Sequence, residues 1–312
     1  MLQFTLKRFA LAALILVVAV TVMFLMIRAV PGDPVSIMLG PRATPELKAR
    51  LISEMGLDRS IPEQLMLYFG GLLRGDLGVD VFSGREVTTI VFEQLPHTLR
   101  LIFSAILWSA VLGIGLGCYA AAHPNTWIDR VAATLSVSFI AAPAFVVALL
   151  SLLLFAVHLQ WFPAIGVGDG FWDTAWHLVL PSFAIGLSWV GYIARLVRAS
   201  MLEVMGESHI RTARAFGLSE RRIIGIYALR IAILPVVTVI GVGMGFLLSS
   251  AVFTEIVFAR PGLGKLVIDS ITTRNYPIVM GAVLVSTALF VISTAIADLI
   301  NAILDPRARS GT

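Results

Sequence analysis

The chain of 312 residues is 58% hydrophobic and only 13% charged, with a mean hydropathy of +0.92. Because soluble domains carry charge on about 25% of their residues, this composition excludes an ordinary soluble protein and indicates an integral membrane protein. The net charge of +4 does not point to nucleic acid, since excess lysine and arginine in a membrane protein usually reports loop topology. The single cysteine, Cys118, excludes a disulfide framework and a cysteine-based metal site.

Six apolar segments are long enough to cross a membrane as helices, which takes about 20 residues each. They are residues 9–27, 101–122, 131–157, 177–194, 231–254 and 276–297. The first segment is longer than the apolar core of a secretory signal, and no small-x-small cleavage motif follows it, so we interpret it as a retained anchor. The sequence predicts an all-α membrane protein with six transmembrane helices.

The distribution of lysine and arginine in short loops predicts the orientation, because these residues concentrate on the cytoplasmic side. Residues 195–230 contain seven arginines, whereas residues 158–176 contain no lysine or arginine. Six spans then place both termini in the cytoplasm. The three basic residues of segment 258–275 lie on the predicted outer side and oppose this orientation.

Two loops are too long to be simple connections, and they define the expected organisation. It comprises an N-terminal transmembrane helix (1–30), an external region (31–96), a core transmembrane domain (97–304) that includes a cytoplasmic coupling loop (195–230), and a cytoplasmic tail (305–312). In the external region, TPELKARLISEMG has apolar residues at helical spacing, with Thr44 as N-cap, Pro45 at the first helical position and Gly56 as terminator. A second amphipathic candidate, PEQLMLYFGGLLRG, ends at Gly75.

Motifs for ATP binding and for common hydrolases are missing from the sequence. It contains no GxxxxGK[ST] phosphate loop, no HExxH zinc motif and no GxSxG nucleophile elbow. The string GVGDG matches the GxGD motif of intramembrane aspartyl proteases. However, its Asp169 lies in a predicted loop, and no second intramembrane aspartate is placed to share a proton with it. A glycine turn is therefore the preferred interpretation of this string.

Glycines four residues apart occur within two of the predicted spans, at Gly113 and Gly117 and again at Gly241 and Gly245. Small residues at this spacing let the backbones of neighbouring helices approach closely. A dinucleotide site would instead need a strand, a turn and a helix in succession, which membrane-embedded helices do not supply. We therefore predict tight helix packing at both pairs.

Two acidic residues, Glu255 and Asp298, lie at or inside the ends of predicted spans. An ionisable residue inside a membrane is costly, so it is a candidate for a substrate pathway or for gating. Both lie near helix ends that can reach water. Capping or a hydrogen bond between subunits is the alternative for each.

The segment RTARAFGLSERR, from Arg211 to Arg222, is unusually polar for such an apolar chain. Ser208 is placed to cap a helix over HIRTARAF, and Gly217 is placed to end it in the left-handed conformation. Ser219 can then cap a second helix that carries Glu220 in its first turn. The segment therefore predicts two helices joined at a glycine.

The first of these helices has one face made of small residues. Ile210, Ala213 and Gly217 fall on this face together with Phe216, and arginines flank it. A helix that binds lipid favours bulky apolar residues and lysines. Small residues beside arginines suit insertion into a protein cleft, where a guanidinium can bridge to carboxylates. We therefore predict docking to a protein, with contact to anionic lipid as the alternative.

RTARAFGLSERR and the following ALRIAILP resemble the EAA loop of ATP-binding-cassette importer permeases, specifically the first permease of the peptide/nickel family. The resemblance spans essentially the whole chain. Further motifs occur in the family's order: VPGDP, MGLDRSIPEQ, LLRGDLG, HLVLPSFAIG, TEIVFARPGLGKLVIDSI and ILDPR. It implies the type I importer permease fold, with five core spans preceded by one extra span and an external helical region.

The resemblance also implies which residues couple the permease to an ATPase. They are His209, Ile210, Arg211, Thr212, Ala213, Arg214, Ala215, Phe216, Gly217, Leu218 and Ser219. Arg211, Thr212 and Ala213 occupy the three positions that give the EAA loop its name. Because an arginine stands where that name has glutamate, a carboxylate role is not carried over.

The resemblance further implies the partners: a second, related permease in a heterodimer, two cytoplasmic ATPase subunits that bind ATP and Mg, and an external substrate-binding protein. No cofactor, metal or catalytic residue is expected on this chain, whose surroundings are the lipid bilayer. Di- and oligopeptides are the expected substrates, with nickel, a metal chelate or glutathione as alternatives within the family. Other classes are an ATP-independent secondary transporter, which inverted repeats or paired broken helices would favour, and an intramembrane enzyme.

Overall fold

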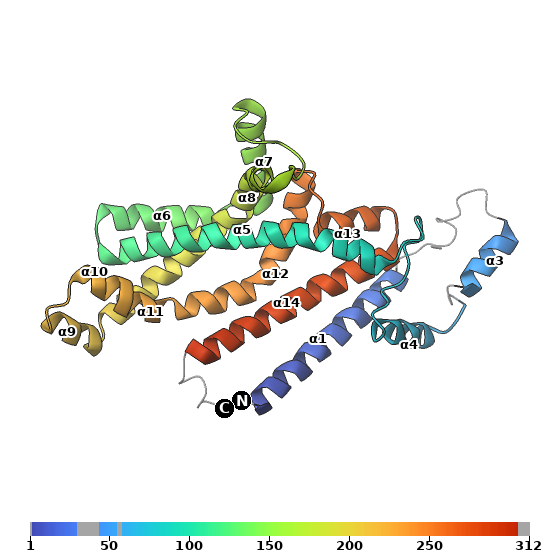
Figure 1. Ribbon diagram of the computed structural model, residues 1–312, viewed down its shortest axis with the longest axis horizontal. Helices are drawn as coiled ribbons and strands as arrows, with labels where there is room; N and C mark the ends of the chain where they lie inside the picture. Colours follow the sequence, from blue (N-terminus) through green and yellow to red (C-terminus); the bar gives the residue numbers. More distant parts are fainter. Residues whose placement is uncertain (1, 30–43, 55–57, 305–312) are drawn as a thin grey trace. The chain divides into compact units, whose positions relative to one another are not determined.

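The computed structural model describes residues 2–29, 44–54 and 58–304 (Figure 1). These residues form helices and loops, with one isolated antiparallel bridge between Val79 and Glu86 and no named strand in the described ranges. The chain divides into two compact units. Unit 1 comprises residues 1–96 and 262–291, and unit 2 comprises residues 97–261 and 292–312. Residues 262–291 therefore pack with the first part of the chain rather than with the rest of the expected core domain.

Helices follow one another along the described chain, joined by turns and loops. They are α1 (Leu2–Ala29), α3 (Pro45–Glu54), α4 (Ile61–Leu72), α5 (Val87–Ala122), α6 (Trp127–Ala141), α7 (Ala144–Ser151), the π-helical η2 (Leu152–His158), α8 (Gly170–Met205), α9 (Ser208–Ala215), α10 (Glu220–Arg222), the π-helical η3 (Ile223–Ala228), α11 (Leu229–Ala232), α12 (Leu234–Val257), α13 (Leu263–Thr272) and α14 (Tyr276–Leu304). The prediction of an all-α chain is confirmed.

Four described helices are long and apolar enough to cross a membrane, and two bent helix pairs raise the number to six if each pair is one span. The first pair, α6 with α7 and η2, bends by 96° at Ala142 and Pro143, and the second bends by 41° before α12. Two of the predicted spans, 131–157 and 231–254, are therefore met by bent helix pairs rather than by single straight helices. Proline lacks an N–H and clashes with the preceding turn, which accounts for a break at Pro143.

Unit 1 packs around Leu77, Val87, Leu263 and Ala282, which are all buried. The predicted helix of TPELKARLISEMG begins at Pro45 as expected, whereas its proposed terminator, Gly56, lies outside the described residues.

A buried carboxylate in unit 1 ties the segment before α5 to the start of α14. Asp80 accepts hydrogen bonds from the Ser83 hydroxyl, from the Asn275 side-chain amide and from the backbone N–H of Phe82 at 3.1 Å. Burial raises the pKa of Asp80, but these hydrogen bonds outweigh it, so the net pKa lies below its ordinary value. The carboxylate therefore stays charged and joins two segments that are 195 residues apart.

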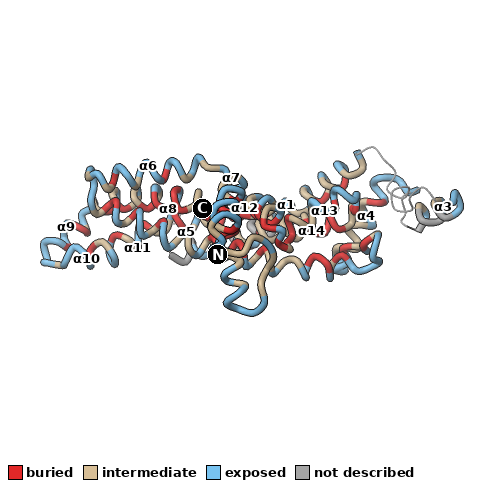
Figure 2. Tube along the Cα trace, turned by 90° about the horizontal axis from the view of Figure 1, so that it is seen from above, coloured by how far each residue is buried: buried red, intermediate tan, exposed pale blue. Residues whose placement is uncertain are grey.

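Unit 2 is organised around α8, whose buried residues lie between the neighbouring helices (Figure 2). Glycines allow this contact: a Cβ built on Gly113 would lie 2.7 Å from Ile193, and one on Gly117 would lie 2.6 Å from the carbonyl oxygen of Ala194. On the other side, a Cβ on Gly191 of α8 would lie 2.4 Å from the backbone of Ser136 in α6. The close packing predicted at Gly113 and Gly117 is confirmed.

Candidate functional site

The polar segment that the sequence singles out forms α9, a sharp turn and α10, at the end of unit 2 where α8 ends (Figure 1). Gly217 has φ +76°, and its N–H donates to the carbonyl of Arg214 at 2.9 Å, while the N–H of Leu218 donates to Ala213 at 3.2 Å. This pair of bonds is a Schellman motif, which satisfies carbonyls that a helix end leaves free. The prediction that Gly217 ends the helix in the left-handed conformation is confirmed.

The N-terminal cap of α9 differs from the prediction by one residue. Glu207 is the N-cap, with extended backbone, and Ser208 is already the first helical residue. The N–H of Arg211 donates to the carbonyl of Glu207 at 3.3 Å, which places the first helical hydrogen bond one residue earlier than expected. Ser219 does precede α10 as its N-cap, as predicted, and its carbonyl accepts from Arg222 and Ile223.

The small face of α9 is turned into the protein. Ile210 is fully buried and Ala213 is nearly so, in one cluster with Val197, Met201 and Val204 of α8. Ile210 and Ala213 are therefore not free to dock in a cleft of another protein, whereas Phe216 and Gly217, which were predicted to share their face, are exposed. A helical pattern of apolar residues shows that one side is covered, but it does not show which chain covers it. Here the covering residues belong to α8 and to the segment that follows α10.

The opposite face of α9 is exposed, as Figure 2 shows for most of α9 and α10. Arg211, Thr212 and Ala215 lie on it, and the Phe216 side chain is 82% exposed. Arg214 donates to Glu220 across the turn, with Nε 2.7 Å from one carboxylate oxygen. The segment therefore presents an exposed aromatic ring and exposed guanidinium groups on a helix whose other side is fixed.

The remaining predicted coupling residues lie around this face. His209 is partly buried, with Nδ1 3.0 Å from the Glu207 carboxylate, and Leu218 is partly buried beside the core cluster. Ser219 is exposed. All eleven predicted residues therefore fall on one continuous structural element, but only some of them present a side chain to solvent.

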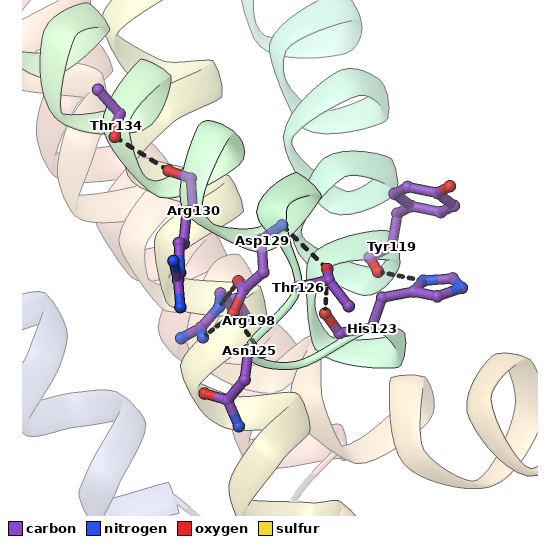
Figure 3. A network of polar contacts seen from close by, with 8 residues as sticks. All are labelled: Tyr119, His123, Asn125, Thr126, Asp129, Arg130, Thr134 and Arg198. Carbon is purple, nitrogen blue, oxygen red and sulfur yellow. Dashed lines mark hydrogen bonds and ion pairs between the residues drawn. The ribbon is translucent and has the colours of Figure 1, made fainter.

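A partly buried ion pair connects α6 to α8 near the same end of unit 2 (Figure 3). Arg198 donates from Nε and Nη2 to the two carboxylate oxygens of Asp129, at 2.5 and 2.6 Å. Asp129 also accepts from the backbone N–H of Asn125 at 3.0 Å, and Thr126 caps α6. The two-pronged geometry gives a stronger and more directional contact than a single ion pair. Sequence analysis missed this pair, because 69 residues separate its members.

Glu255, a sequence candidate for the pathway, is almost completely buried and accepts a hydrogen bond from the Thr98 hydroxyl at 2.6 Å. Asp298, the other candidate, is partly buried within α14. The environment of Glu255 is that of a residue that holds helices together.

Arg260 lies near Glu255, and sequence analysis considered it only as a loop charge, not as a candidate site residue. It is fully buried, and its Nη1 donates to the backbone carbonyls of Gly166 at 2.9 Å and His177 at 3.1 Å. Burial lowers the pKa of Arg260, and the negative charge of Glu255 opposes that shift. Arg260 was one of the basic residues that opposed the predicted orientation. Its burial shows that it fastens a loop to α8.

Metal binding has no candidate site in the described residues, since no group of three or more His, Cys, Asp or Glu side chains could hold an ion.

Comparison with known proteins decides the family. The description "binding-protein-dependent transport system inner membrane component" matches residues 113–310, and the N-terminal component of the same systems matches residues 1–102. The chain belongs to this permease family. It is 36% identical over 310 residues to the glutathione transport system permease protein GsiC of Salmonella choleraesuis, and 34% identical to that of Escherichia coli K12, with 99% of each chain covered.

The fold agrees with a solved permease. The MetNI methionine ABC transporter, in an inward-facing conformation, aligns with a TM-score of 0.50 over 70% of this chain and 96% of that chain, at 19% identity. The predicted importer permease fold is confirmed, and so is the resemblance to the peptide/nickel family. The chain is a transport component of an ATP-driven, binding-protein-dependent importer in the inner membrane, and it is not an enzyme. The secondary-transporter and intramembrane-enzyme alternatives do not describe it.

Proposed function

We propose that this permease forms half of a pathway for short peptides, paired with a second related permease, and that α9 docks onto one of two cytoplasmic ATPase subunits. ATP and Mg would be bound by those subunits. An external substrate-binding protein would deliver the peptide. ATP-driven closure of the ATPases would favour one of two arrangements of the spans, because the docked α9 contacts the ATPase differently in each.

The observation that carries the docking proposal is the two-sided character of α9. Ile210 and Ala213 fasten one side to α8, and Phe216 projects from the exposed side at 82% exposure. An exposed phenylalanine flanked by guanidinium groups suits an interface centre, where aromatic residues and arginine are enriched. A force applied to the exposed side would therefore be transmitted to α8 through a buried contact.

The orientation proposed for the chain follows from the same loop. Seven arginines lie in residues 195–230, and this concentration is typical of a cytoplasmic segment. Both termini are then cytoplasmic, and the segment between α1 and α5 is external. The burial of Arg260 supports this orientation, since a basic residue buried by the protein does not act as a loop charge.

The substrate proposal rests on the names of the relatives. Two relatives that match over nearly the whole chain are named as glutathione permeases, and glutathione is a short modified peptide. We therefore favour short peptides, with glutathione among them.

Docking is tested with Phe216→Asp in the importer assembled from this chain, its partner permease and the ATPases. The charged side chain should reduce both co-purification of the ATPase and ATP-dependent uptake into vesicles. Phe82→Asp is the matched control, since Phe82 is also an exposed phenylalanine but lies in unit 1, and it should leave co-purification unchanged. Equal co-purification of the two variants would contradict the proposal.

The substrate is tested separately, by mass spectrometry of the ligand that co-purifies with the binding protein encoded in the same gene cluster. A peptide or glutathione is the expected result. A metal chelate would overturn the substrate proposal and leave the docking proposal intact.

A further inference from the structure

A groove runs along the surface of unit 2 between α5 and α6, with α8 as its floor, and has a volume of about 220 Å³. Its lining includes Leu116, Ala120, Ala133, Val137, Arg195 and Arg198. The groove exists because α5 and α6 each contact α8 through glycines and small residues, which leaves space where larger side chains would otherwise meet. All of its lining lies within one unit.

The groove is apolar at one end and basic at the other. Leu116 and Val137 lie deeper within their helices and are partly exposed at 42% and 56%, whereas Arg195 and Arg198 lie towards the end of α8 that leads to α9. The α5 wall belongs to a helix long and apolar enough to cross a membrane, and the α6 wall belongs to the bent pair that passes the same test together. The groove therefore runs from the hydrocarbon region towards one membrane surface.

The two arginines of the groove differ in their partners. Arg198 is held by Asp129 through two hydrogen bonds (Figure 3). Arg195 lies one helical turn away, is exposed, and makes no hydrogen bond or ion pair within the part of the chain that the structure describes. Arg130, next to Asp129, also carries a guanidinium group without an ion pair among the described residues. Of these three guanidinium groups, only that of Arg198 has a carboxylate partner among the described residues, so the basic end keeps uncompensated positive charge.

We propose that this groove binds an anionic phospholipid, with one acyl chain along Leu116 and Val137 and the phosphate on Arg195. Placing the basic end in the cytoplasmic leaflet rests on the orientation in the proposed function. The cytoplasmic leaflet carries anionic lipids, and their negative surface potential attracts arginine side chains near the membrane. A planar guanidinium group can donate two hydrogen bonds at once to the oxygens of a phosphate group.

Other occupants fit the groove less well. Water gains few hydrogen bonds at the apolar end of the groove, where leucine, valine and alanine side chains form the lining. A free phosphate ion would contact the basic end and leave the apolar end empty. A lipid is the occupant that satisfies both ends.

The test is native mass spectrometry of the assembled importer, incubated in detergent with phosphatidylglycerol or with phosphatidylcholine of the same acyl chains. The wild type should retain phosphatidylglycerol about fivefold better, the factor expected for one arginine near an anionic headgroup. Arg195→Gln should remove this preference. Arg74→Gln, which makes the same charge change at an exposed arginine of unit 1, should keep it.

The apolar end is tested with Ala133→Phe, which fills the groove and should lower the retention of both lipids. Ala133→Leu replaces it if the larger side chain prevents assembly, which size-exclusion chromatography reports. The proposal is overturned if the wild type retains both lipids equally. It is also overturned if Arg195→Gln and Ala133→Phe both retain phosphatidylglycerol as the wild type does. A photocrosslinking amino acid in place of Val137 should label lipid, and labelling of the partner permease instead would also overturn it. Because retention is measured without ATP or substrate, a failure of the transport or docking proposals would leave this result unaffected.

Discussion

Unit 2 carries charged residues in two contrasting settings. On α9 and α10, Arg211 and the Arg214–Glu220 pair are exposed to solvent. Around the end of α12, Glu255 and Arg260 are buried and hydrogen-bonded to Thr98 and to backbone carbonyls. The exposed charged groups keep most of their hydration when the chain folds. Each buried charged group loses its hydration and depends on its protein partners.

This contrast separates residues that hold the permease together from residues that remain available to a partner. A buried charge is costly to leave unpaired, so its removal should lower stability. An exposed charge contributes little to stability, so its removal should affect partner binding instead. Substitutions at single positions test this separation, from the largest expected effect to the smallest.

Arg260→Ala should be the most damaging substitution, with a loss of about 3–5 kcal/mol in the free energy of unfolding. It takes the side-chain donor from the carbonyls of Gly166 and His177 and removes the positive charge that Arg260 places near the buried Glu255. Thermal unfolding of the purified protein in detergent, followed by tryptophan fluorescence, measures the loss. Arg222→Ala removes an exposed arginine as the control, and equal melting temperatures for the two variants would refute the contrast.

Asp129→Asn should cost about 2 kcal/mol, because it weakens two charge-assisted hydrogen bonds to Arg198. A double-mutant cycle with Arg198→Gln isolates this pair. The second substitution should add little once the carboxylate is gone. If the losses in the free energy of unfolding caused by the two substitutions are additive, the Asp129–Arg198 pair does not stabilise the contact between α6 and α8.

Asp80 predicts a pH dependence in unit 1. Since its folded pKa lies below the ordinary value, its contribution is fully present above the unfolded pKa of about 3.9 and is lost as pH falls through the folded pKa. The difference in melting temperature between wild type and Asp80→Asn should be constant above about pH 4 and should shrink below it. Asp76→Asn, at an exposed neighbour, should show a smaller difference, and a gap that widens on acidification would contradict the assignment.

Gly217→Ala should destabilise by about 1 kcal/mol, because an L-residue pays this cost in the left-handed conformation. Nothing lies within 4 Å of a Cβ built there, so the effect comes from the backbone alone. Gly225 also has open space around it but sits in η3 without a positive φ. Gly225→Ala should therefore be neutral or slightly stabilising, and a cost equal to that of Gly217→Ala would show that φ is not the cause.

Glu220→Gln should leave the melting temperature unchanged, since the Arg214–Glu220 pair is exposed and its attraction is screened by solvent. The same variant frees the Arg214 guanidinium and should alter ATPase co-purification before it alters stability. A clear fall in melting temperature would show that the Arg214–Glu220 pair stabilises the fold, as the buried charges do, and would contradict the contrast.

Local signals allowed part of this structure to be predicted from sequence. Gly217 was predictable because the left-handed end of α9 depends on one residue and its near neighbours. The close contacts at Gly113 and Gly117 were predictable because small residues four apart lie on one helix face. The cap of α9 was misplaced by one residue because both Glu207 and Ser208 precede the turn, and the extended backbone selects Glu207.

Long-range contacts could not be predicted in this way. Thr98 and Glu255 are 157 residues apart, and no local pattern in the sequence joins them. The face of Ile210 and Ala213 was recognised, but its covering residues were not, since periodicity is the same whether a helix packs on its own chain or on another. The break at Pro143 had a local cause, yet neither its 96° bend nor the contact of α7 with α8 follows from a local pattern.

The length of α8 has a mechanical consequence. Its 36 residues form one continuous helix, about 54 Å long at 1.5 Å per residue. Such a helix acts as a lever: a tilt of a few degrees at its α9 end displaces its other end by several ångströms. Pro181 lies within the helix, eleven residues from its start, and removes one hydrogen bond there. The part of α8 between Pro181 and α9 is therefore a long regular helix. The missing hydrogen bond lies close to the other end of α8, where Arg260 donates to the carbonyl of His177.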